Sequence, residues 1–269
     1  MASLSAASPQ AAAGHIASHV VRAIDSAPAV AEPFQHLQLA NVFPPETYAE
    51  MIASMPDNRD YRGMSGRAKS MPADGGKLTR TKIDLFPEFI RHLPASKRAI
   101  WSAVGAALCS PEVREAFRRR LAPGLEKRFG ARYKEVGMYP IPILTRDVAG
   151  YKIGIHPDTR RKGMTIQLYL PPDRAIEHVG TVFHRRLEGK NYEKAAQMSF
   201  SPNVGYAFAV GSDTYHSVET VGPEVRTRDS ILLTYFVDDT FTQVVHNRAK
   251  RVGNFVLNEF RSLDRKSVV

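Results

Sequence analysis

Residues 151–170 read YKIGIHPDTRRKGMTIQLYL, and this stretch decides the fold. Two runs rich in Ile, Leu, Thr and Tyr, at 151–156 and 165–170, stand on either side of a basic segment that starts with Pro157 and Asp158. Short runs of β-branched and aromatic residues that end in turn-forming residues are typical of β-strands. The stretch therefore predicts two strands joined by a short connection.

The same pattern of short β-branched and aromatic runs separated by turn-forming residues continues on both sides of this stretch, from about residue 137 to residue 236. The predicted strands are 137–144, 151–156, 165–170, 180–184, 197–201, 206–210, 216–221 and 230–236. Eight short strands with mostly short connections favour a double-stranded β-helix, or jelly roll, which closes over an interior site. The predicted fold class is α+β with a mainly β core and buttressing helices before and after it.

Apolar residues at helical spacing mark the chain outside the strands, from Ile100 to Leu121 and again from Val252 to Leu263. We expect one compact domain in four parts. These are a loose N-terminal arm at 1–32, a mainly helical part at 33–135, the jelly-roll core at 136–240 and a C-terminal amphipathic helix at 241–269. A Gly-rich segment at 56–80 predicts a long loop, which is either a lid or an excursion without a role.

Composition excludes several classes of protein. The 269 residues are 43% hydrophobic and carry 37 Lys and Arg against 27 Asp and Glu, which describes an ordered globular chain rather than a disordered one. No apolar stretch approaches the roughly 20 residues that span a bilayer. The single cysteine, Cys109, excludes an intrachain disulfide and a thiolate zinc site, so we expect a cytoplasmic protein that contacts no membrane.

The formal charge of +10 favours anionic partners. Eight Lys and Arg but only four Glu lie between residues 110 and 135. Solvated helix faces explain this excess better than a nucleic-acid surface, because no aromatic residues are interleaved for base stacking. The expected partner is a small molecule, whether anionic or not, and nucleic acid is not expected. The sequence leaves the oligomeric state open.

Three residues form a candidate metal site. His156 and Asp158 make a His-x-Asp pattern at the end of a predicted strand, where side chains two residues apart can converge on one point. His216 opens the seventh predicted strand and can supply the third ligand. Two His and one carboxylate form the facial triad that binds non-haem Fe(II) and leaves coordination positions open. The other seven histidines are interpreted as surface or core residues.

A second pattern follows His216 and suggests an anion site. Arg228 and Ser230 share one strand face at the start of the last predicted strand, so a guanidinium and a hydroxyl could hold one carboxylate. A dicarboxylate bound to the metal would fit. Arg226 is a rival for Arg228, but it has no Ser partner at the same spacing.

With these motifs in this order, the stretch from Ile141 to Phe236 resembles the Fe(II)- and 2-oxoglutarate-dependent oxygenases, in their prolyl-hydroxylase-like branch. The resemblance implies that His156, Asp158 and His216 are catalytic iron ligands. It implies that Arg228 and Ser230 hold the far carboxylate of 2-oxoglutarate, with Tyr169 as a further contact. It also implies dioxygen as a cosubstrate, succinate and carbon dioxide as products, and hydroxylation of a C–H bond as the default reaction.

The substrate remains open at this point. The basic residues Arg160, Arg161, Lys162, Arg185 and Arg186 suit an anionic small molecule such as an amino acid or a natural-product intermediate, or they are ordinary solvated charges. A protein or peptidyl hydroxylase of the same superfamily is an alternative. So is a jelly roll that only binds a ligand, or a cupin-like metal enzyme that needs no 2-oxoglutarate.

Overall fold

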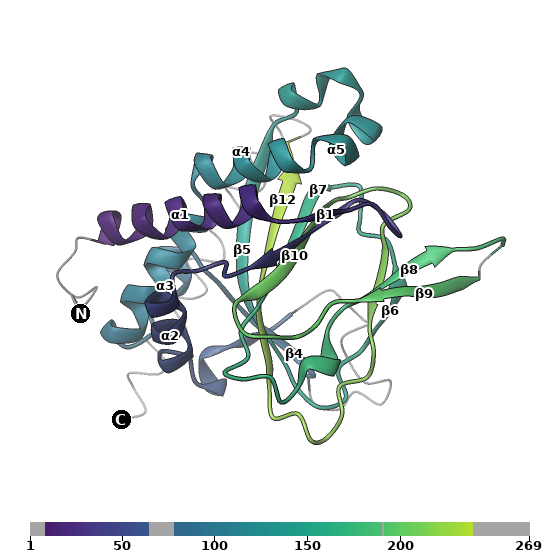
Figure 1. The fold of residues 1–269 in the computed structure, drawn as a ribbon. Coiled ribbons are helices and arrows are strands. Elements are labelled where there is room, and N and C mark those ends of the chain that lie inside the picture. Colours follow the sequence, from purple (N-terminus) through teal and green to yellow (C-terminus); the bar gives the residue numbers. More distant parts are fainter. Residues whose placement is uncertain (1–8, 65–77, 190, 239–269) are drawn as a thin grey trace.

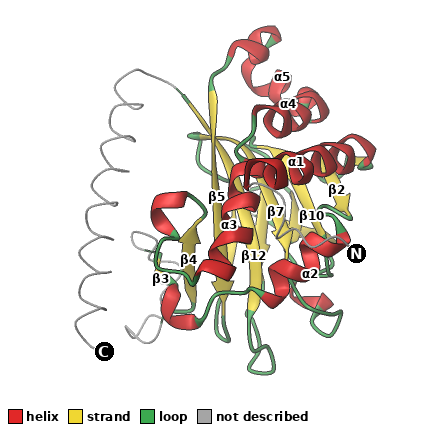
Figure 2. Ribbon diagram, turned by 90° about the vertical axis from the view of Figure 1, so that its left-hand side faces the viewer, coloured by secondary structure: helices red, strands yellow, loops and turns green. Residues whose placement is uncertain are grey.

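The computed structural model describes residues 9–64, 78–189 and 191–238. This part of the chain combines five α-helices with two antiparallel β-sheets, and the helices α1, α3 and α4 cover one face of the larger sheet (Figure 2). Figure 1 shows the hairpin of β8 and β9 projecting from the smaller sheet, away from these helices. The predicted mainly β core with flanking helices is therefore confirmed as a mixed fold with mostly antiparallel sheets.

The sheets divide the eight core strands between them. The larger sheet has the order β1 (Ala29–Val30), β2 (His36–Ala40), β10 (Val204–Ala209), β7 (Lys162–Tyr169), β12 (Arg228–Val237), β5 (Met138–Asp147), β4 (Arg80–Asp84) and β3 (Arg62–Gly63). The smaller sheet has the order β6 (Ile153–His156), β11 (Tyr215–Val218), β8 (Val182–Arg186) and β9 (Tyr192–Gln197). From β5 to β12 the chain changes sheet at every step except the β8–β9 hairpin.

The five described α-helices are 8 to 18 residues long, and two of them have recognisable end signals. They are α1 (Pro9–Ser26), α2 (Pro45–Ala53), α3 (Ala95–Leu108), α4 (Pro111–Arg120) and α5 (Ala122–Phe129). The hydroxyl of Ser110 accepts a hydrogen bond from the backbone N–H of Val113 and caps α4, which has Pro111 at its first position. Helix α5 ends at Gly130, whose φ of +72° suits a residue without a side chain.

The main core lies between the helices and the larger sheet. Ile16 of α1, Trp101 of α3 and Phe117 of α4 are buried together with Ile166 and Leu233 of the sheet. Helix α3 also approaches the chain after β4 very closely. A Cβ atom at Gly105 would lie 2.2 Å from the carbonyl oxygen of Leu85, so only glycine fits at this position.

A second, aromatic cluster lies between the two sheets. Phe183 of β8 and Val218 of β11 pack there with Tyr169, Tyr206 and Phe208 of the larger sheet. The ring centroids of Phe183 and Tyr206 are 5.0 Å apart in an edge-on arrangement, which is favourable for aromatic pairs. This cluster fixes the separation of the sheets, and the candidate site lies between the same two sheets.

The prediction of a loose arm at 1–32 is wrong for the residues that the structure describes. Residues 9–26 form α1, and Ile16, Val20 and Ile24 are almost fully buried. These three residues repeat every fourth position and form one apolar helix face, which the abundance of Ala and Ser in this segment obscures. The segment is thus part of the main core.

Other boundaries also differ from the sequence expectations. The fifth strand is Tyr192–Gln197 rather than 197–201, and the eighth begins at Arg228. Within the predicted loop at 56–80, Asn58–Asp60 forms a 3-10 turn, Arg62–Gly63 forms β3 and Arg80 begins β4. Residues 65–77 and the predicted C-terminal helix at 241–269 lie outside the described residues.

None of the helices in the described ranges combines the length and the apolar character that a membrane span needs.

Candidate functional site

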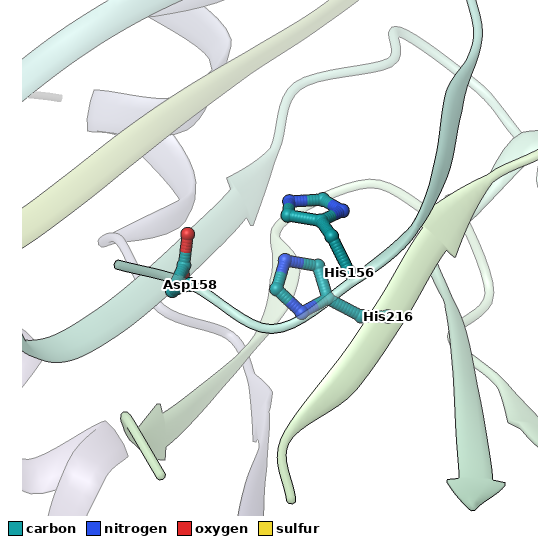
Figure 3. Close-up of side chains that lie close together, drawn as sticks. All are labelled: His156, Asp158 and His216. Carbon is teal, nitrogen blue, oxygen red and sulfur yellow. The ribbon is translucent and has the colours of Figure 1, made fainter. Parts of the chain in front are cut away.

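The three predicted metal ligands come together at one end of the smaller sheet (Figure 3). His156 ends β6, His216 lies in β11, and the two residues are direct neighbours in the antiparallel pairing of these strands. Asp158 follows two residues after His156. One ligand atom from each residue lies within 4.8 Å of the other two, a spacing compatible with one shared metal ion.

Both imidazoles are held by backbone carbonyls. Nδ1 of His156 is 2.8 Å from the carbonyl oxygen of Gly154, and Nδ1 of His216 is 3.0 Å from that of Thr214. A carbonyl oxygen can only accept, so each Nδ1–H donates and Nε2 is the ring nitrogen that could bind a metal. Burial lowers the pKa of His216 to about 4, so this ring is neutral at pH 7, as a metal ligand must be.

Asp158 is held in its ionised form by two neighbours. Its Oδ1 accepts a hydrogen bond from Nζ of Lys162 at 2.5 Å, and its Oδ2 accepts one from the hydroxyl of Thr165 at 2.7 Å. Burial by itself would raise the pKa of the Asp158 carboxyl, but the charge of Lys162 and the hydrogen bonds from Lys162 and Thr165 hold it well below its usual range. Lys162 was expected to suit an anionic substrate or to be an ordinary solvated charge, whereas the structure pairs it with Asp158.

A narrow cavity runs between the two sheets from this triad to Arg228. Its wall is formed by Arg80, Tyr151, Ile153, His156, Asp158, Lys162, Thr165, Gln167, Thr181, Tyr206, His216, Val218, Arg228 and Leu232. The metal-ligand candidates and the predicted anion-binding arginine therefore line one cavity, as a bidentate ligand with a distal charge would require.

Arg228 carries an unused hydrogen-bond donor at the far end of the cavity. Its Nε donates to the carbonyl oxygen of Val179 and its Nη1 to Oδ2 of Asp147, both at 2.7 Å. Its Nη2 is buried and has no hydrogen-bond partner among the described residues. A buried guanidinium nitrogen without an acceptor is costly, which suggests an anionic ligand at this place.

Ser230 and Tyr169 have their hydroxyls occupied by the protein. The Ser230 hydroxyl is 2.8 Å from Oγ1 of Thr145 and accepts a hydrogen bond from Nε2 of Gln167 at 2.6 Å. The Tyr169 hydroxyl donates to Oγ1 of Thr181 and accepts from its backbone N–H, both at 3.0 Å. They thus support Gln167 and Thr181, which line the cavity, and direct contact with a cosubstrate stays a prediction.

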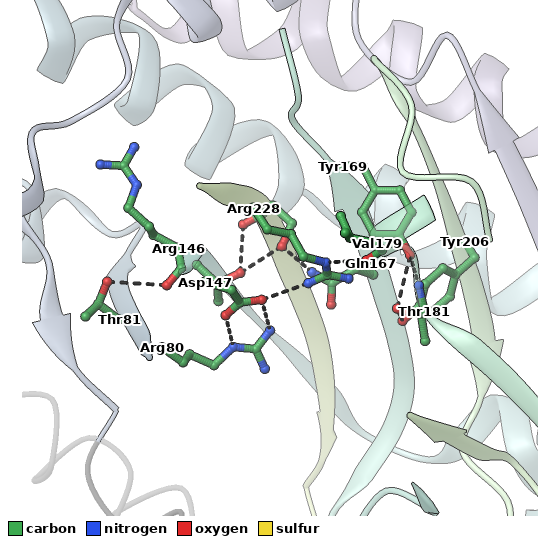
Figure 4. Close-up of polar contacts among 12 residues, drawn as sticks. Arg80, Thr81, Arg146, Asp147, Gln167, Tyr169, Val179, Thr181, Tyr206 and Arg228 are labelled. Carbon is green, nitrogen blue, oxygen red and sulfur yellow. Dashed lines mark hydrogen bonds and ion pairs between the residues drawn. The ribbon is translucent and has the colours of Figure 1, made fainter. Parts of the chain in front are cut away.

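The structure also separates the two rival arginines and adds a third. Arg226 is exposed before β12, whereas Arg228 is 1% exposed and lines the cavity. Arg80 lines the cavity as well and pairs with Asp147 (Figure 4). No sequence pattern pointed to Arg80, because it stands at the end of a segment predicted as a loop and its partner is 67 residues away.

Comparison with known proteins finds similarity only at the level of the fold. No protein-family model matches the sequence, and no curated protein matches it. A prolyl-4-hydroxylase from Pseudomonas putida is 15% identical, with a TM-score of 0.48, over 82% of this chain and 98% of that chain. An oxidoreductase of the 2OG-Fe(II) oxygenase family from Burkholderia pseudomallei is 14% identical, with a TM-score of 0.46, over 86% and 92%.

A third similar structure is the non-haem α-ketoglutarate-dependent epimerase SnoN of nogalamycin biosynthesis. It is 12% identical, with a TM-score of 0.41, over 84% of this chain and 83% of that chain. At such low identity the functional argument rests on the site itself.

Proposed function

We propose that this protein is an Fe(II)- and 2-oxoglutarate-dependent dioxygenase with a double-stranded β-helix, or jelly-roll, core. One observation carries the proposal. A His-Asp-His cluster with ligand atoms within 4.8 Å and a buried arginine with an unused donor line the same cavity. This pair of features matches a cosubstrate that chelates a metal at one end and carries a carboxylate at the other.

The donor set fits ferrous iron. Two imidazoles whose Nδ1–H groups donate to backbone carbonyls and one ionised carboxylate are the ligand types of the facial triad. When bound, iron with 2-oxoglutarate would supply the oxidative decarboxylation that activates dioxygen, with succinate and carbon dioxide as products. Hydroxylation of an unactivated C–H bond is the reaction that we propose.

The residues of the chain orient the metal ligands and the cosubstrate, and they keep water out of the cavity. The carbonyls of Gly154 and Thr214 fix the orientation of both imidazole rings. Arg228 holds the distal carboxylate through Nη2 and thereby orients the cosubstrate along the cavity. Aromatic residues between the sheets, among them Tyr206 and Phe208, are almost fully buried and exclude water from its inner side.

For the substrate we propose an anionic small molecule. A larger cavity, of about 900 Å³, shares Asp158 with the narrow cavity, so an occupant would lie beside the metal site. Its wall includes the basic residues Lys127, Arg128, Arg160 and Arg186 against the acidic Asp158 and Asp213. A cavity of this size holds a small molecule, and the excess of basic residues favours an acidic one.

Turnover with Fe(II) and 2-oxoglutarate tests this proposal. Succinate should form in the wild-type protein and not in His216→Ala, and an acidic substrate should raise the rate of succinate formation. Arg160→Gln and Arg186→Gln should raise the KM for that substrate and leave the KM for 2-oxoglutarate unchanged. Arg132→Gln, which removes an exposed arginine elsewhere, is the matched control.

Two other results would favour a different function. Stimulation by proline-containing peptides and by no small molecule would favour a peptidyl hydroxylase. Folded, iron-loaded protein that forms no succinate under any condition would favour a cupin-like enzyme or a ligand-binding jelly roll.

A further inference from the structure

Three charged residues form a row across neighbouring strands at the far end of the narrow cavity. Asp147 of β5 lies directly opposite Arg80 of β4 on one side and opposite Arg228 of β12 on the other. Directly opposite residues in antiparallel strands project to the same face of a sheet. All three side chains therefore meet on the face that lines the cavity (Figure 4).

Asp147 bridges the two arginines. Nε of Arg80 donates to its Oδ1 at 2.6 Å and Nη2 of Arg80 to its Oδ2 at 3.0 Å, while Nη1 of Arg228 donates to the same Oδ2 at 2.7 Å. The side chains of Asp147, Arg228 and Arg80 are 0%, 1% and 8% exposed. The guanidinium of Arg80 also lies 4.3 Å from the centroid of the Tyr151 ring.

The charge balance of this row depends on Arg80. Two guanidinium groups and one carboxylate leave a net charge of one positive unit, which balances the charge of one bound carboxylate. Without Arg80, Asp147 would neutralise Arg228, and a carboxylate that approached the free Nη2 would meet a neutral pair. In a water-poor cavity such a carboxylate lacks the compensating charge that its desolvation requires.

We infer that Arg80 supplies the net positive charge that allows the cavity to bind the distal carboxylate at Arg228, with Asp147 as the residue that positions both arginines. The inference rests on the proposed function, because it concerns the cosubstrate of the same site. It assigns a role in cosubstrate selection to a strand that precedes the eight core strands.

Variants that change charge and hydrogen bonding separately test the inference. Arg80→Gln removes the charge and keeps a donor for Asp147, whereas Arg80→Lys keeps the charge. The double variant Arg80→Gln with Asp147→Asn restores one net positive charge, because the amide oxygen introduced at position 147 would still accept from Nη1 of Arg228. Lys82→Gln is the matched control, since Lys82 lies on the same strand and face but pairs with Asp84 instead.

The readout is the affinity of anaerobic, Fe(II)-loaded protein for two 2-oxo acids, measured by the visible charge-transfer band. 2-Oxopentanoate has the carbon chain of 2-oxoglutarate with a methyl group in place of the distal carboxylate. The preference for 2-oxoglutarate over 2-oxopentanoate therefore isolates the contribution of the distal carboxylate, and metal binding cancels. Thermal unfolding of each variant shows whether it is folded.

We expect Arg80→Gln to reduce this preference by about tenfold or more, the value of a charge-assisted contact. Arg80→Lys, the double variant and Lys82→Gln should each retain it within about threefold, because each keeps the net charge of the row. If Arg80→Gln does not fold, Asp147→Asn alone tests the inference by changing the net charge in the opposite direction. It should increase the preference for 2-oxoglutarate over 2-oxopentanoate, since it leaves two uncompensated positive charges.

Failure of the inference differs from failure of the proposed function. An unchanged preference in folded Arg80→Gln, or no recovery in the double variant, would overturn the inference while the charge-transfer bands still supported the oxygenase. No band with either compound in the wild-type protein would overturn the proposed function itself.

Discussion

The two ends of the narrow cavity are built in opposite ways. At the metal end the ligand atoms face one another and each ring is oriented by a backbone carbonyl, with His156 only half-buried. At the arginine end Arg80, Asp147 and Arg228 are almost fully buried and bound to one another through both oxygens of one carboxylate. A metal that must exchange ligands needs accessible donors, whereas an anchor for a carboxylate needs a fixed charge.

The largest effect is expected for Asp158, because it is a proposed metal ligand and also pairs with the buried Lys162. Asp158→Ala should abolish iron binding and turnover, a greater loss than the roughly 10–100-fold that a supporting residue costs. It also removes the carboxylate that buried Lys162 contacts, so we expect about 3–5 kcal/mol of lost stability. Iron titration and thermal unfolding measure the two effects.

His156→Ala is the matched control for the stability effect. It should lose iron binding to a similar extent but unfold close to the wild-type temperature, since the His156 ring is half-buried and its Nδ1 contacts a backbone carbonyl rather than a buried charge. Equal destabilisation by both substitutions would show that the Asp158–Lys162 pair does not stabilise the fold.

At the arginine end, Arg228→Met should weaken 2-oxoglutarate binding and leave iron binding intact. The expected loss of about 1.5–3 kcal/mol corresponds to roughly 10- to 150-fold in affinity. Arg226→Met, which changes an exposed arginine two residues earlier, should have no effect. A loss of 2-oxoglutarate affinity in Arg226→Met but not in Arg228→Met would show that Arg226, and not Arg228, holds the distal carboxylate.

A smaller effect is expected at Tyr169, which lies behind the cavity wall. Tyr169→Phe removes the hydrogen bonds between its hydroxyl and Thr181 and should cost about 1 kcal/mol of stability. Its 2-oxoglutarate affinity should change by less than about threefold, because the hydroxyl is occupied by the protein. A tenfold loss of affinity without a loss of stability would show direct contact with the cosubstrate.

The smallest effect concerns the stability of the fold in acid, and it involves neither end of the cavity. His36 is fully buried, and burial lowers the pKa of its imidazole below the ordinary 6.5. The unfolded state therefore binds a proton that the folded state excludes, so stability falls as the pH drops below about 6.5. The melting temperature of His36→Asn should decline less between pH 7 and pH 5.5 than that of the wild-type protein.

His178→Asn, a change at an exposed histidine, is the control for this pH effect and should leave the wild-type decline unchanged. An identical decline in His36→Asn and the wild-type protein would mean that other groups account for the acid sensitivity.

The same contrast explains what could be predicted from the sequence. His156 and Asp158 form a local pattern, and His216 lies at the start of a strand that its own composition reveals, so the clustering of these three residues could be predicted. The row at the other end is created by register across three strands, with Arg80 and Asp147 67 residues apart. Register of this kind depends on tertiary pairing, which short-range patterns do not encode.

Errors in the strand assignment have a similar cause. The strand β9 lies at the edge of the smaller sheet and is largely exposed, with charged residues such as Glu193 and Lys194. Edge strands need no apolar face, and their sequences therefore look like loops. The apolar residues Met198 and Phe200, which suggested a strand, fill the aromatic cluster from an irregular segment instead.

We propose that one cavity binds Fe(II) through His156, Asp158 and His216 and binds a 2-oxo acid beside it. Anaerobic titration of the Fe(II)-loaded protein with 2-oxoglutarate tests this most directly. We predict a visible metal-to-ligand charge-transfer band in the wild-type protein and none in His216→Ala. Folded, iron-loaded wild-type protein without such a band, or an equal band in His216→Ala, would contradict the claim.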